Sequence, residues 1–338
     1  MGWEKIHGHD RIRDGFIRAH HRGRLAHAYL FAGPRGVGKH LFAVELARAL
    51  FCEKPPTPLH ACDHCPSCLQ IDAGTHPDFH IAARPPESLE FPIELMRETC
   101  DIFSLKSARG RGKVVVVDDA DDLNPESANC FLKTLEEPPA GSMIILIGTS
   151  PEHQLPTIRS RCQMVRFGGL ADSQIERMLE DHRIEKTVHR ETIIRLASGS
   201  PGLALQLADP GLWDMRNRLA RELVAQPLDS VGLGRAWMAF AEESGKESSL
   251  QRTRAKMVLR LLIELFRAAL LFQQDGRVAT AGASDVPLLQ ELTRRLDTEQ
   301  LLDLLDRCME ADFQIDRRVQ LVLILESLMD HLAQRMAN

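Results

Sequence analysis

The sequence predicts an α/β domain built around a parallel sheet in the first half of the chain, followed by two all-α domains. Three observations lead to this fold class: a phosphate-binding loop follows a short apolar run, apolar runs alternate with helical patterns up to residue 168, and only helical patterns follow. The 338 residues suffice for two or three domains. We place these domains at residues 1–168, 169–209 and 210–338.

Five apolar runs are expected to form the strands of the sheet. The run at 114–117 consists of four valines, which is typical of a strand buried on both faces. Helical patterns separate the runs, so the strands are expected to lie parallel, with helices on both faces of the sheet. The five runs are Tyr29–Ala32, Phe79–Ala82, Val114–Val117, Met143–Ile147 and Gln163–Phe167.

Three helices are predicted between these strands. Leu41–Phe51 repeats apolar residues in steps of three and four, and Ile93–Leu105 is a second helical pattern. Asn124 can cap a third helix that has Pro125 at its first position and ends before Pro138. After residue 168, short helical segments run from Leu170 to Leu207 and long apolar stripes follow, which we interpret as core packing. A loop is predicted at Thr280–Ser284.

The run from Gly33 to His40 fits the phosphate-loop pattern G-x-x-x-x-G-K-[ST] at every fixed position except the last. The backbone N–H groups of such a loop surround phosphates, its lysine contacts the outer phosphates, and its final hydroxyl holds Mg²⁺. Gly33, Gly36, Gly38 and Lys39 are present, but His40 replaces the hydroxyl. The pattern therefore indicates a nucleotide-binding fold without indicating hydrolysis.

Asp118 and Asp119 directly follow the valine run, where nucleotide-hydrolysing proteins with a phosphate loop hold Mg²⁺ and polarise water. Taken alone, the pair could merely cap a strand, but the phosphate loop upstream makes a nucleotide role the stronger interpretation. Ring ATPases usually have Glu at the second position. Since Asp119 is one methylene shorter, it is a doubtful base.

Four of the eight cysteines lie within 17 residues, with the spacing C-x9-C-x2-C-x2-C. Four soft ligands in one loop suit a structural Zn²⁺ site, and such a closed site leaves no position for metal catalysis. Chance clustering and a redox pair are the alternatives, and His60, His64 and His76 are lower-ranked candidate ligands. The predicted ligands are Cys52, Cys62, Cys65 and Cys68.

Arg161 stands just before the last predicted strand, in the run S-R-C. It is either a solvated surface arginine or a residue that reaches into a neighbouring subunit's nucleotide site. The spacing does not choose between these two roles. The basic stretch Lys106–Lys113 is interpreted as a solvated turn, with a DNA contact as the weaker alternative.

Composition limits the remaining function classes. The net charge is -5 and aromatic residues are few, which argues against a stacking platform for single-stranded nucleic acid. Met1–Lys5 lacks the apolar core of a signal peptide, and the apolar stretch Leu261–Phe272 is interrupted by charges and too short to span a bilayer. We therefore expect a cytoplasmic protein without a membrane partner.

In their order along the chain, these features resemble those of bacterial clamp-loader subunits, a family of AAA+ proteins. The shared features are the phosphate loop, the four-cysteine insertion, His76-Pro77-Asp78, and the acidic run 118–121. The run L-K-T-L-E-E-P-P at 132–139, followed by S-R-C at 160–162, is highly specific to that family. The resemblance covers the first 210 residues and looks greatest to the delta-prime subunits of DNA polymerase III.

The resemblance implies a P-loop AAA+ (RecA-like) domain with a zinc module at 52–68, a helical lid at 169–209, and a helical collar at 210–338 that assembles a hetero-pentamer. It implies gamma/tau and delta subunits as partners, with the sliding clamp and primed DNA reached through the complex. Arg161 matches the family's arginine finger, which acts on an adjacent ATPase subunit. Thr149 falls near the first sensor position, and the four cysteines match the zinc ligands.

Two departures separate this chain from the motor subunits of the family. The motors carry Ser or Thr at the position of His40 and Arg at the position of Gly202. Delta-prime subunits typically bind nucleotide weakly or not at all, so the resemblance favours a largely non-hydrolysing stator of the loader. Lys39 leaves weak binding of ATP and Mg²⁺ open. The alternatives are a self-sufficient gamma/tau-like ATPase motor and, less favoured, a zinc-dependent DNA-binding scaffold.

Overall fold

The computed structural model describes residues 2–88, 90–185, 187–224, 229–275 and 285–337. The chain divides into two compact units. Unit 1 consists of Met1–His182 with Ser198–Leu203, and unit 2 consists of Arg183–Ala197 with Ala204–Asn338. Residues of the predicted 169–209 domain fall in both units, and the three-domain division stays a prediction.

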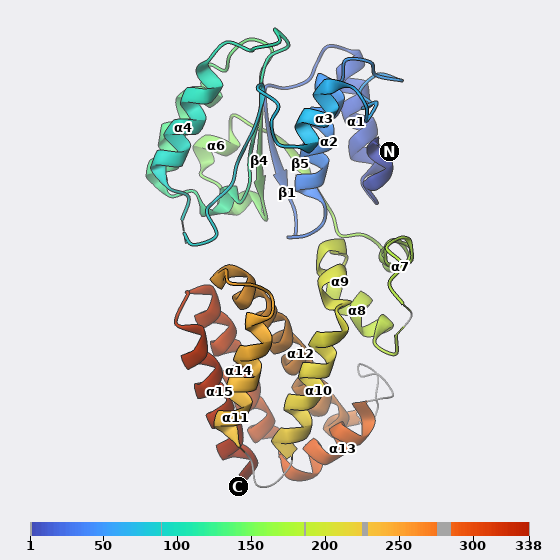
Figure 1. Ribbon diagram of the computed structural model, residues 1–338, viewed down its shortest axis with the longest axis vertical. Helices are drawn as coiled ribbons and strands as arrows, with labels where there is room; N and C mark the ends of the chain where they lie inside the picture. The colour runs from blue at the N-terminus through green and yellow to red at the C-terminus, as the bar shows by residue number, and fades with distance from the viewer. Residues whose placement is uncertain (1, 89, 186, 225–228, 276–284, 338) are drawn as a thin grey trace. The chain divides into compact units, whose positions relative to one another are not determined.

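Unit 1 contains a five-stranded sheet in the order β2-β3-β4-β1-β5, in which every neighbouring pair is parallel (Figure 1). The predicted parallel sheet is confirmed, with small shifts at the strand ends. The strands are β1 (Ala28–Ala32), β2 (Phe79–Ala82), β3 (Val114–Val117), β4 (Met143–Gly148) and β5 (Gln163–Arg166).

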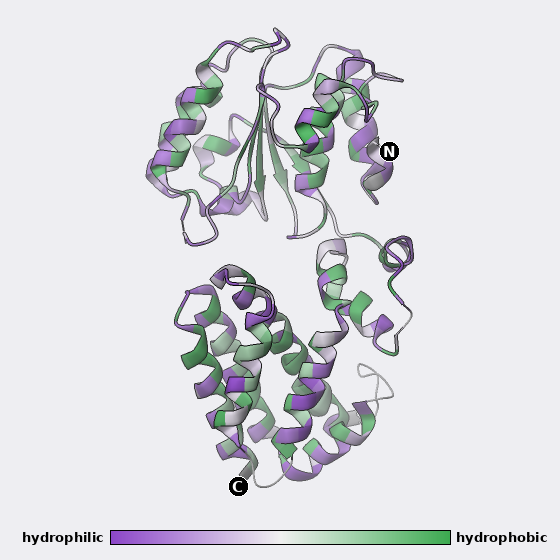
Figure 2. Ribbon diagram, in the orientation of Figure 1, coloured by the Kyte–Doolittle hydropathy of each residue, from purple (hydrophilic) through white to green (hydrophobic). Residues whose placement is uncertain are grey.

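Both faces of the sheet are buried, because alternate residues of each strand point to opposite faces. Phe31 and Ile145 face a cluster formed with the first helices, whereas Leu30 and Leu146 face a cluster formed with the later ones. All four residues are fully or almost fully buried. The central strands are accordingly hydrophobic along their length (Figure 2). The two layers of helices fix the positions of the loops that follow the strands.

The helices of unit 1 lie in two layers, with α1, α2 and α3 on one face of the sheet and α4, α5 and α6 on the other. Asn124 caps α5 as predicted, since its Oδ1 accepts a hydrogen bond from Ser127 N at 2.9 Å, a contact worth about 1 kcal/mol. Helices α1 and α3 are not among the predicted elements. The bounds are η1 (Gly2–Lys5), α1 (Asp10–His21), α2 (Lys39–Phe51), α3 (Pro66–Asp72), α4 (Ile93–Ser104), η2 (Ala120–Asp122), α5 (Pro125–Glu136), η3 (Pro151–His153), α6 (Pro156–Arg159) and α7 (Asp172–Asp181).

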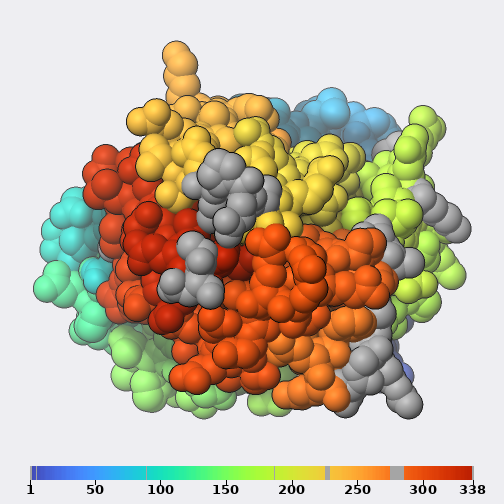
Figure 3. Space-filling view, turned by 90° about the horizontal axis from the view of Figure 1, so that it is seen from below, coloured from blue at the N-terminus to red at the C-terminus, as the bar shows by residue number. Residues whose placement is uncertain are grey.

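The secondary-structure elements in the described residues of unit 2 are all helices. Helix α12 packs against α10, α11, α13 and α14, and α15 packs against α11 and α14. Figure 3 shows yellow, orange and red segments of this unit on one face. The predicted loop at Thr280–Ser284 lies outside the described residues. The bounds are α8 (Arg190–Ala197), α9 (Pro201–Leu207, which begins in unit 1), α10 (Pro210–Val224), α11 (Ser230–Glu242), α12 (Ser248–Asp275), α13 (Val286–Arg295), α14 (Thr298–Asp316) and α15 (Leu321–Ala337).

No helix in the described part of the chain is both long enough and apolar enough to cross a membrane.

Candidate nucleotide site and metal centre

The phosphate loop joins β1 to α2 and depends on two glycines with left-handed backbone angles. Gly36 has φ +75° and Gly38, which precedes α2, has φ +103°. A Cβ atom at Gly36 would lie 2.4 Å from Ser200 Oγ, so a side chain at this position requires Ser200 to shift. The sequence therefore builds the loop expected for backbone N–H groups that surround phosphates.

Lys39 is turned toward its own loop. Its Nζ donates hydrogen bonds to the carbonyl oxygens of Gly33 and, at 2.7 Å, of Pro34. The residue is only 6% exposed, and this burial lowers the pKa of its amine. In this arrangement Lys39 satisfies loop carbonyls, and reaching an outer phosphate requires it to exchange those partners.

His40 contacts the carboxylate that the sequence assigns to Mg²⁺ binding. His40 Nδ1 lies 2.7 Å from Asp118 Oδ2. This hydrogen bond raises the pKa of His40 against the opposing effect of its burial. Burial favours a higher pKa for Asp118, but the hydrogen bond and charge of His40 outweigh it and hold the pKa below its usual value. A protonated His40 thus supplies positive charge to Asp118 at the position where the sequence pattern expects a metal ligand.

Asp119 lies beside this pair in a less common backbone conformation, with φ 52°. Its Oδ1 is 3.9 Å from Arg35 Nη2. Burial and the neighbouring charge of Asp118 raise the pKa of Asp119. The carboxylate lines the cavity at this site, and among the described residues this long contact with Arg35 is its only ion pair.

Asp121 is a site residue that the sequence reasoning did not single out. Its Oδ2 accepts hydrogen bonds from both the N and the Oγ1 of Thr149, each at 2.6 Å. Its Oδ1 accepts from Gln154 Nε2 at 2.8 Å. Asp121 therefore anchors the loop after β4 and fixes the predicted sensor residue. The sequence signal that could have identified Asp121 is its position in the acidic run 118–121 after β3.

A cavity of about 440 Å³ brings most of the predicted nucleotide-site residues together. This volume falls within the range of small-molecule sites, roughly 300–1,000 Å³. Gly33 and Arg161 are not part of the lining. The lining consists of Arg35, Gly36, Gly38, Lys39, His40, Leu41, Asp118, Asp119, Asp121, Ile147, Gly148 and Thr149.

The first turn of α9 packs directly on the phosphate loop within unit 1. Gly202 N donates to Gly36 O at 3.0 Å. A Cβ atom at Gly202 would lie 3.2 Å from both the Cα and the O of Gly36. Two glycine backbones are therefore in contact at the position where the resemblance expects an arginine in motor subunits, and a long side chain there requires the loop to move.

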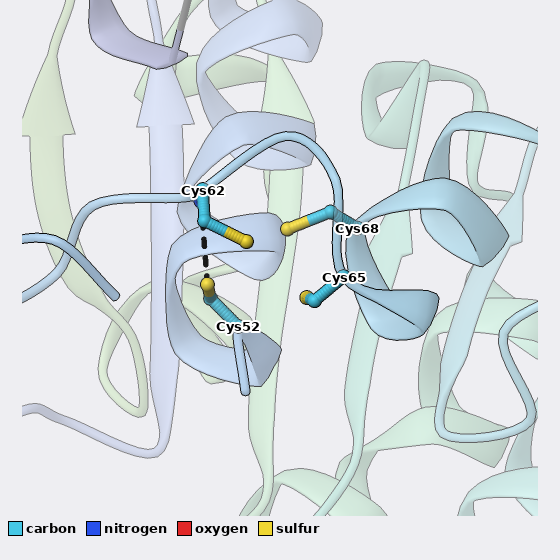
Figure 4. A group of neighbouring side chains, drawn as sticks. All are labelled: Cys52, Cys62, Cys65 and Cys68. Carbon is cyan, nitrogen blue, oxygen red and sulfur yellow. Dashed lines mark hydrogen bonds between the residues drawn. The ribbon is translucent and has the colours of Figure 1, made fainter. Parts of the chain in front are cut away.

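The four predicted cysteines form one cluster (Figure 4). Their sulfur atoms all lie within 4.8 Å of one another, and three of the four residues are buried. Cys62 N donates to Cys52 Sγ at 3.3 Å. Cys65 precedes α3 and Cys68 lies on it. Burial favours a higher pKa for Cys65, but hydrogen bonds from the N–H groups of Glu53 and Cys68 lower it to about 6. Four convergent sulfurs fit a tetrahedral Zn²⁺.

The three histidines near the cluster have other partners. His60 Nδ1 lies 3.1 Å from Pro58 O, and His64 Nδ1 lies 2.6 Å from Cys62 O. The ring of His76 stacks on Phe51 with the centroids 4.6 Å apart. None of the three belongs to the cluster, which agrees with their lower rank as ligands.

The basic stretch before β3 is exposed at Lys106, Arg109 and Arg111, as the sequence suggested, but two of its arginines also have partners in the cysteine module. Arg109 Nη1 donates to Glu53 Oε1 at 2.5 Å and to Ser67 Oγ at 2.6 Å. Arg111 Nη1 donates to Cys52 O at 3.1 Å. These arginines therefore tie the cysteine module to the rest of unit 1. The sequence does not reveal these contacts, because the partners lie more than 40 residues away along the chain.

Arg161 follows α6 at the surface of unit 1, where Glu136 at the end of α5 holds it. Its Nε donates to Glu136 Oε1 at 3.0 Å, and its Nη2 donates to the same oxygen. Its Nη1 donates to Thr157 O at 2.8 Å. The guanidinium thus has a fixed direction but does not line the cavity of its own chain.

The His40–Asp118 contact predicts a pH dependence. His40 has a raised pKa, so its contribution is full below the usual value of 6.5 and is lost as pH rises through the folded-state value. Asp118 has a lowered pKa, so its contribution is present above 3.8 and is lost as pH falls through the folded-state value. The Asp118→Asn variant is expected to lower the His40 pKa, measured by NMR titration of the imidazole. An unchanged His40 pKa in that variant contradicts the contact.

Comparisons with known proteins agree with this geometry. Residues 8–171 match the protein family described as DNA polymerase III, delta subunit. The chain is 34% identical to DNA polymerase III subunit delta' of Pseudomonas aeruginosa, covering 64% of this chain and 67% of that protein. It is 28% identical to subunit delta' of Bacillus subtilis, covering 92% and 91%. It is 34% identical to subunit tau of Escherichia coli, covering 62% of this chain and 33% of that protein. The chain therefore belongs to the family of bacterial DNA polymerase III delta-prime subunits, which are clamp-loader proteins with the AAA+ fold.

Proposed function

We propose that this chain is a largely non-hydrolysing stator of the DNA polymerase III clamp loader. In this role it supplies an arginine finger to a neighbouring ATPase subunit while the sliding clamp is loaded onto primed DNA in replication. The observation that carries the proposal is the 2.7 Å contact between His40 and Asp118. In this contact His40, which replaces the metal-binding hydroxyl of the loop, engages Asp118, the carboxylate that Mg²⁺ needs.

Two further contacts support weak or absent binding of ATP and Mg²⁺. Lys39 donates its hydrogen bonds to carbonyls of the phosphate loop, so phosphate binding must displace those partners. Gly202 packs on Gly36, so this position supplies no arginine side chain for a phosphate. From the contacts of His40, Lys39 and Gly202 together, we expect the isolated chain to have little or no ATPase activity.

The surroundings of Arg161 support its role as a finger acting in trans. The guanidinium lies at the surface, and Glu136 and the Thr157 carbonyl fix its direction. A directed arginine loses less conformational freedom when it docks against a phosphoryl group than a freely rotating one does. Because Arg161 does not line the cavity of its own chain, a neighbouring subunit is the site on which it can act.

Subunit contacts belong to unit 2 in this proposal. Helix α14 carries exposed apolar residues at related positions, Leu302, Met309 and Phe313, with exposed fractions of 50%, 60% and 59%. Exposed apolar side chains at helical spacing suit a helix–helix interface. We infer that the predicted 210–338 collar contacts gamma/tau and delta subunits in a hetero-pentamer, in the cytoplasm, with Zn²⁺ at the four cysteines as a structural cofactor.

The His40→Thr variant tests the cause assigned to weak nucleotide binding. Threonine supplies the missing hydroxyl and leaves Asp118 free, so Mg²⁺ is expected to tighten ATP binding by about tenfold, which is 1.4 kcal/mol. In the wild type, Mg²⁺ is expected to change ATP affinity little. Isothermal titration with and without EDTA measures both, and His20→Thr on the exposed side of α1 is the control. Equal Mg²⁺ dependence in wild type and His40→Thr contradicts the assignment.

The alternative function is a self-sufficient motor like the gamma/tau subunits. Lys39 and the cavity of about 440 Å³ favour it, because both are adequate for a nucleotide. A motor must turn over Mg²⁺-ATP in isolation, and its turnover must disappear in Lys39→Ala.

A further inference from the structure

A groove lies at the free edge of the sheet in unit 1, apart from the phosphate loop. Strand β5 is the last strand of the sheet and pairs only with β1 among the described residues. Helix α1 and β5 together border a cavity of about 440 Å³. Its lining includes the arginines Arg11, Arg24 and Arg166 and the apolar residues Ile12, Met164 and Val165.

The charge of this groove has one sign. Arg11, Arg24 and Arg166 are exposed side chains in its lining, and no carboxylate lines it. None of the three forms an ion pair or side-chain hydrogen bond within the described ranges. The nearby acids of α1 are engaged elsewhere, since Asp10 and Asp14 pair with Arg13 at 2.8 and 3.0 Å. The groove therefore presents three cations that form no ion pair in the described ranges, over an apolar floor. Glu152, whose charge acts on Arg166, accepts a hydrogen bond from Ser150.

The backbone of β5 is open on the groove side. Phe167 N donates to Ala32 O at 2.7 Å, so alternation turns the N–H and C=O groups of Met164 and Arg166 away from β1. An unpaired edge of this kind is a template for an added strand. Four residues span about 13 Å, which fits a segment of about four to six residues.

We propose that this groove binds an extended acidic peptide segment of a partner protein, which adds as a strand to β5. Main-chain hydrogen bonds to Met164 and Arg166 would align the segment, apolar side chains would contact Ile12 and Val165, and carboxylates would pair with the arginines. A second copy of this chain is disfavoured, because its own arginines would face the same three cations. Single-stranded nucleic acid is disfavoured, because Phe16 and Tyr29 are each only 5% exposed and offer no face for stacking.

The experiment uses the purified full chain and a fluorescein-labelled hexapeptide that alternates aspartate with leucine. The expected result is saturable binding by anisotropy, with no binding of the same peptide carrying lysine in place of aspartate. The double variant Arg24→Glu/Arg166→Glu is expected to weaken binding by about tenfold or more. Arg22→Glu, an exposed arginine outside the lining, is the matched control and is expected to bind as wild type does.

A second variant separates strand addition from simple charge attraction. Met164→Pro removes an N–H group that points away from β1, and proline is tolerated on an edge strand at such a position. It is expected to weaken peptide binding several-fold while zinc content and circular dichroism stay unchanged. Hydrogen exchange of the segment containing Met164 and Arg166 is expected to slow when the peptide binds.

Three outcomes overturn the proposal: peptide affinity that neither the arginine nor the proline variant changes, binding of an oligothymidylate at this groove without binding of the acidic peptide, or dimerisation of the chain through the groove in sedimentation. The test needs no other loader subunit, so its result is independent of the proposed stator function.

Discussion

The Arg161→Ala variant is expected to slow ATP hydrolysis at the adjacent subunit of a reconstituted loader by about 10³-fold or more, since arginine fingers contribute about 10³–10⁵ in rate. Arg161 projects from the end of α6 with its direction fixed by Glu136, so its loss removes charge stabilisation without disturbing the core of unit 1. The DNA-stimulated ATPase activity of the loader should then fall to the activity that its other nucleotide sites contribute. Single-turnover phosphate release measures the effect, and size-exclusion chromatography should show an intact complex.

Arg159→Ala is the matched control, because Arg159 is an exposed arginine on α6 two residues away. It is expected to leave DNA-stimulated ATPase unchanged. Arg161→Lys keeps the charge but loses the planar fork of donors. Its DNA-stimulated ATPase activity should therefore be close to that of Arg161→Ala. Normal ATPase activity in an assembled Arg161→Ala loader rules out the finger role.

The Cys68→Ser variant is expected to lose zinc and to destabilise unit 1 by about 4 kcal/mol or more, because metal loss is among the largest single-residue effects and zinc binding is coupled to folding. Cys68 is fully buried, and Arg109 and Arg111 tie the module around it to the rest of the unit. A loss of this size lowers the melting temperature by about 10 °C. Chelation of the wild type should produce a similar shift.

Cys130→Ser is the control for this measurement, since Cys130 is a partly buried cysteine of α5 outside the cluster. It is expected to keep one zinc per chain, measured by atomic emission on the same sample as the melting curve. Full zinc content and an unchanged melting temperature in Cys68→Ser are incompatible with the proposed metal centre.

The sheet and the composition of the candidate site could be predicted because both depend on local patterns. Valine runs and alternating helical patterns identify the strands, and parallel strands place the residues that follow them at one edge. Gly36, Asp118 and Thr149 each follow a different strand and meet at one cavity for this reason. The cysteine spacing works in the same way, because its ligands are close along the chain.

The contacts that decide the chemistry could not be predicted, because they join residues far apart in sequence. His40 and Asp118 are separated by 78 positions, and Gly36 meets Gly202 from a segment beyond the sheet. Motif matching shows that a hydroxyl is absent, but it does not show that the replacing imidazole binds the carboxylate. The hydrogen bond of Arg109 to Glu53 could not be predicted for the same reason, since the two residues lie 56 positions apart.

The most direct test of the stator function is Mg²⁺-ATP turnover by the purified chain, compared with Lys39→Ala. The contact of His40 with Asp118 and the engagement of Lys39 by its own loop predict turnover no higher than that of the variant. The same sample should contain one zinc per chain, which shows that unit 1 is intact. Robust Mg²⁺-dependent turnover that disappears in Lys39→Ala contradicts the account and identifies the chain as an ATPase motor.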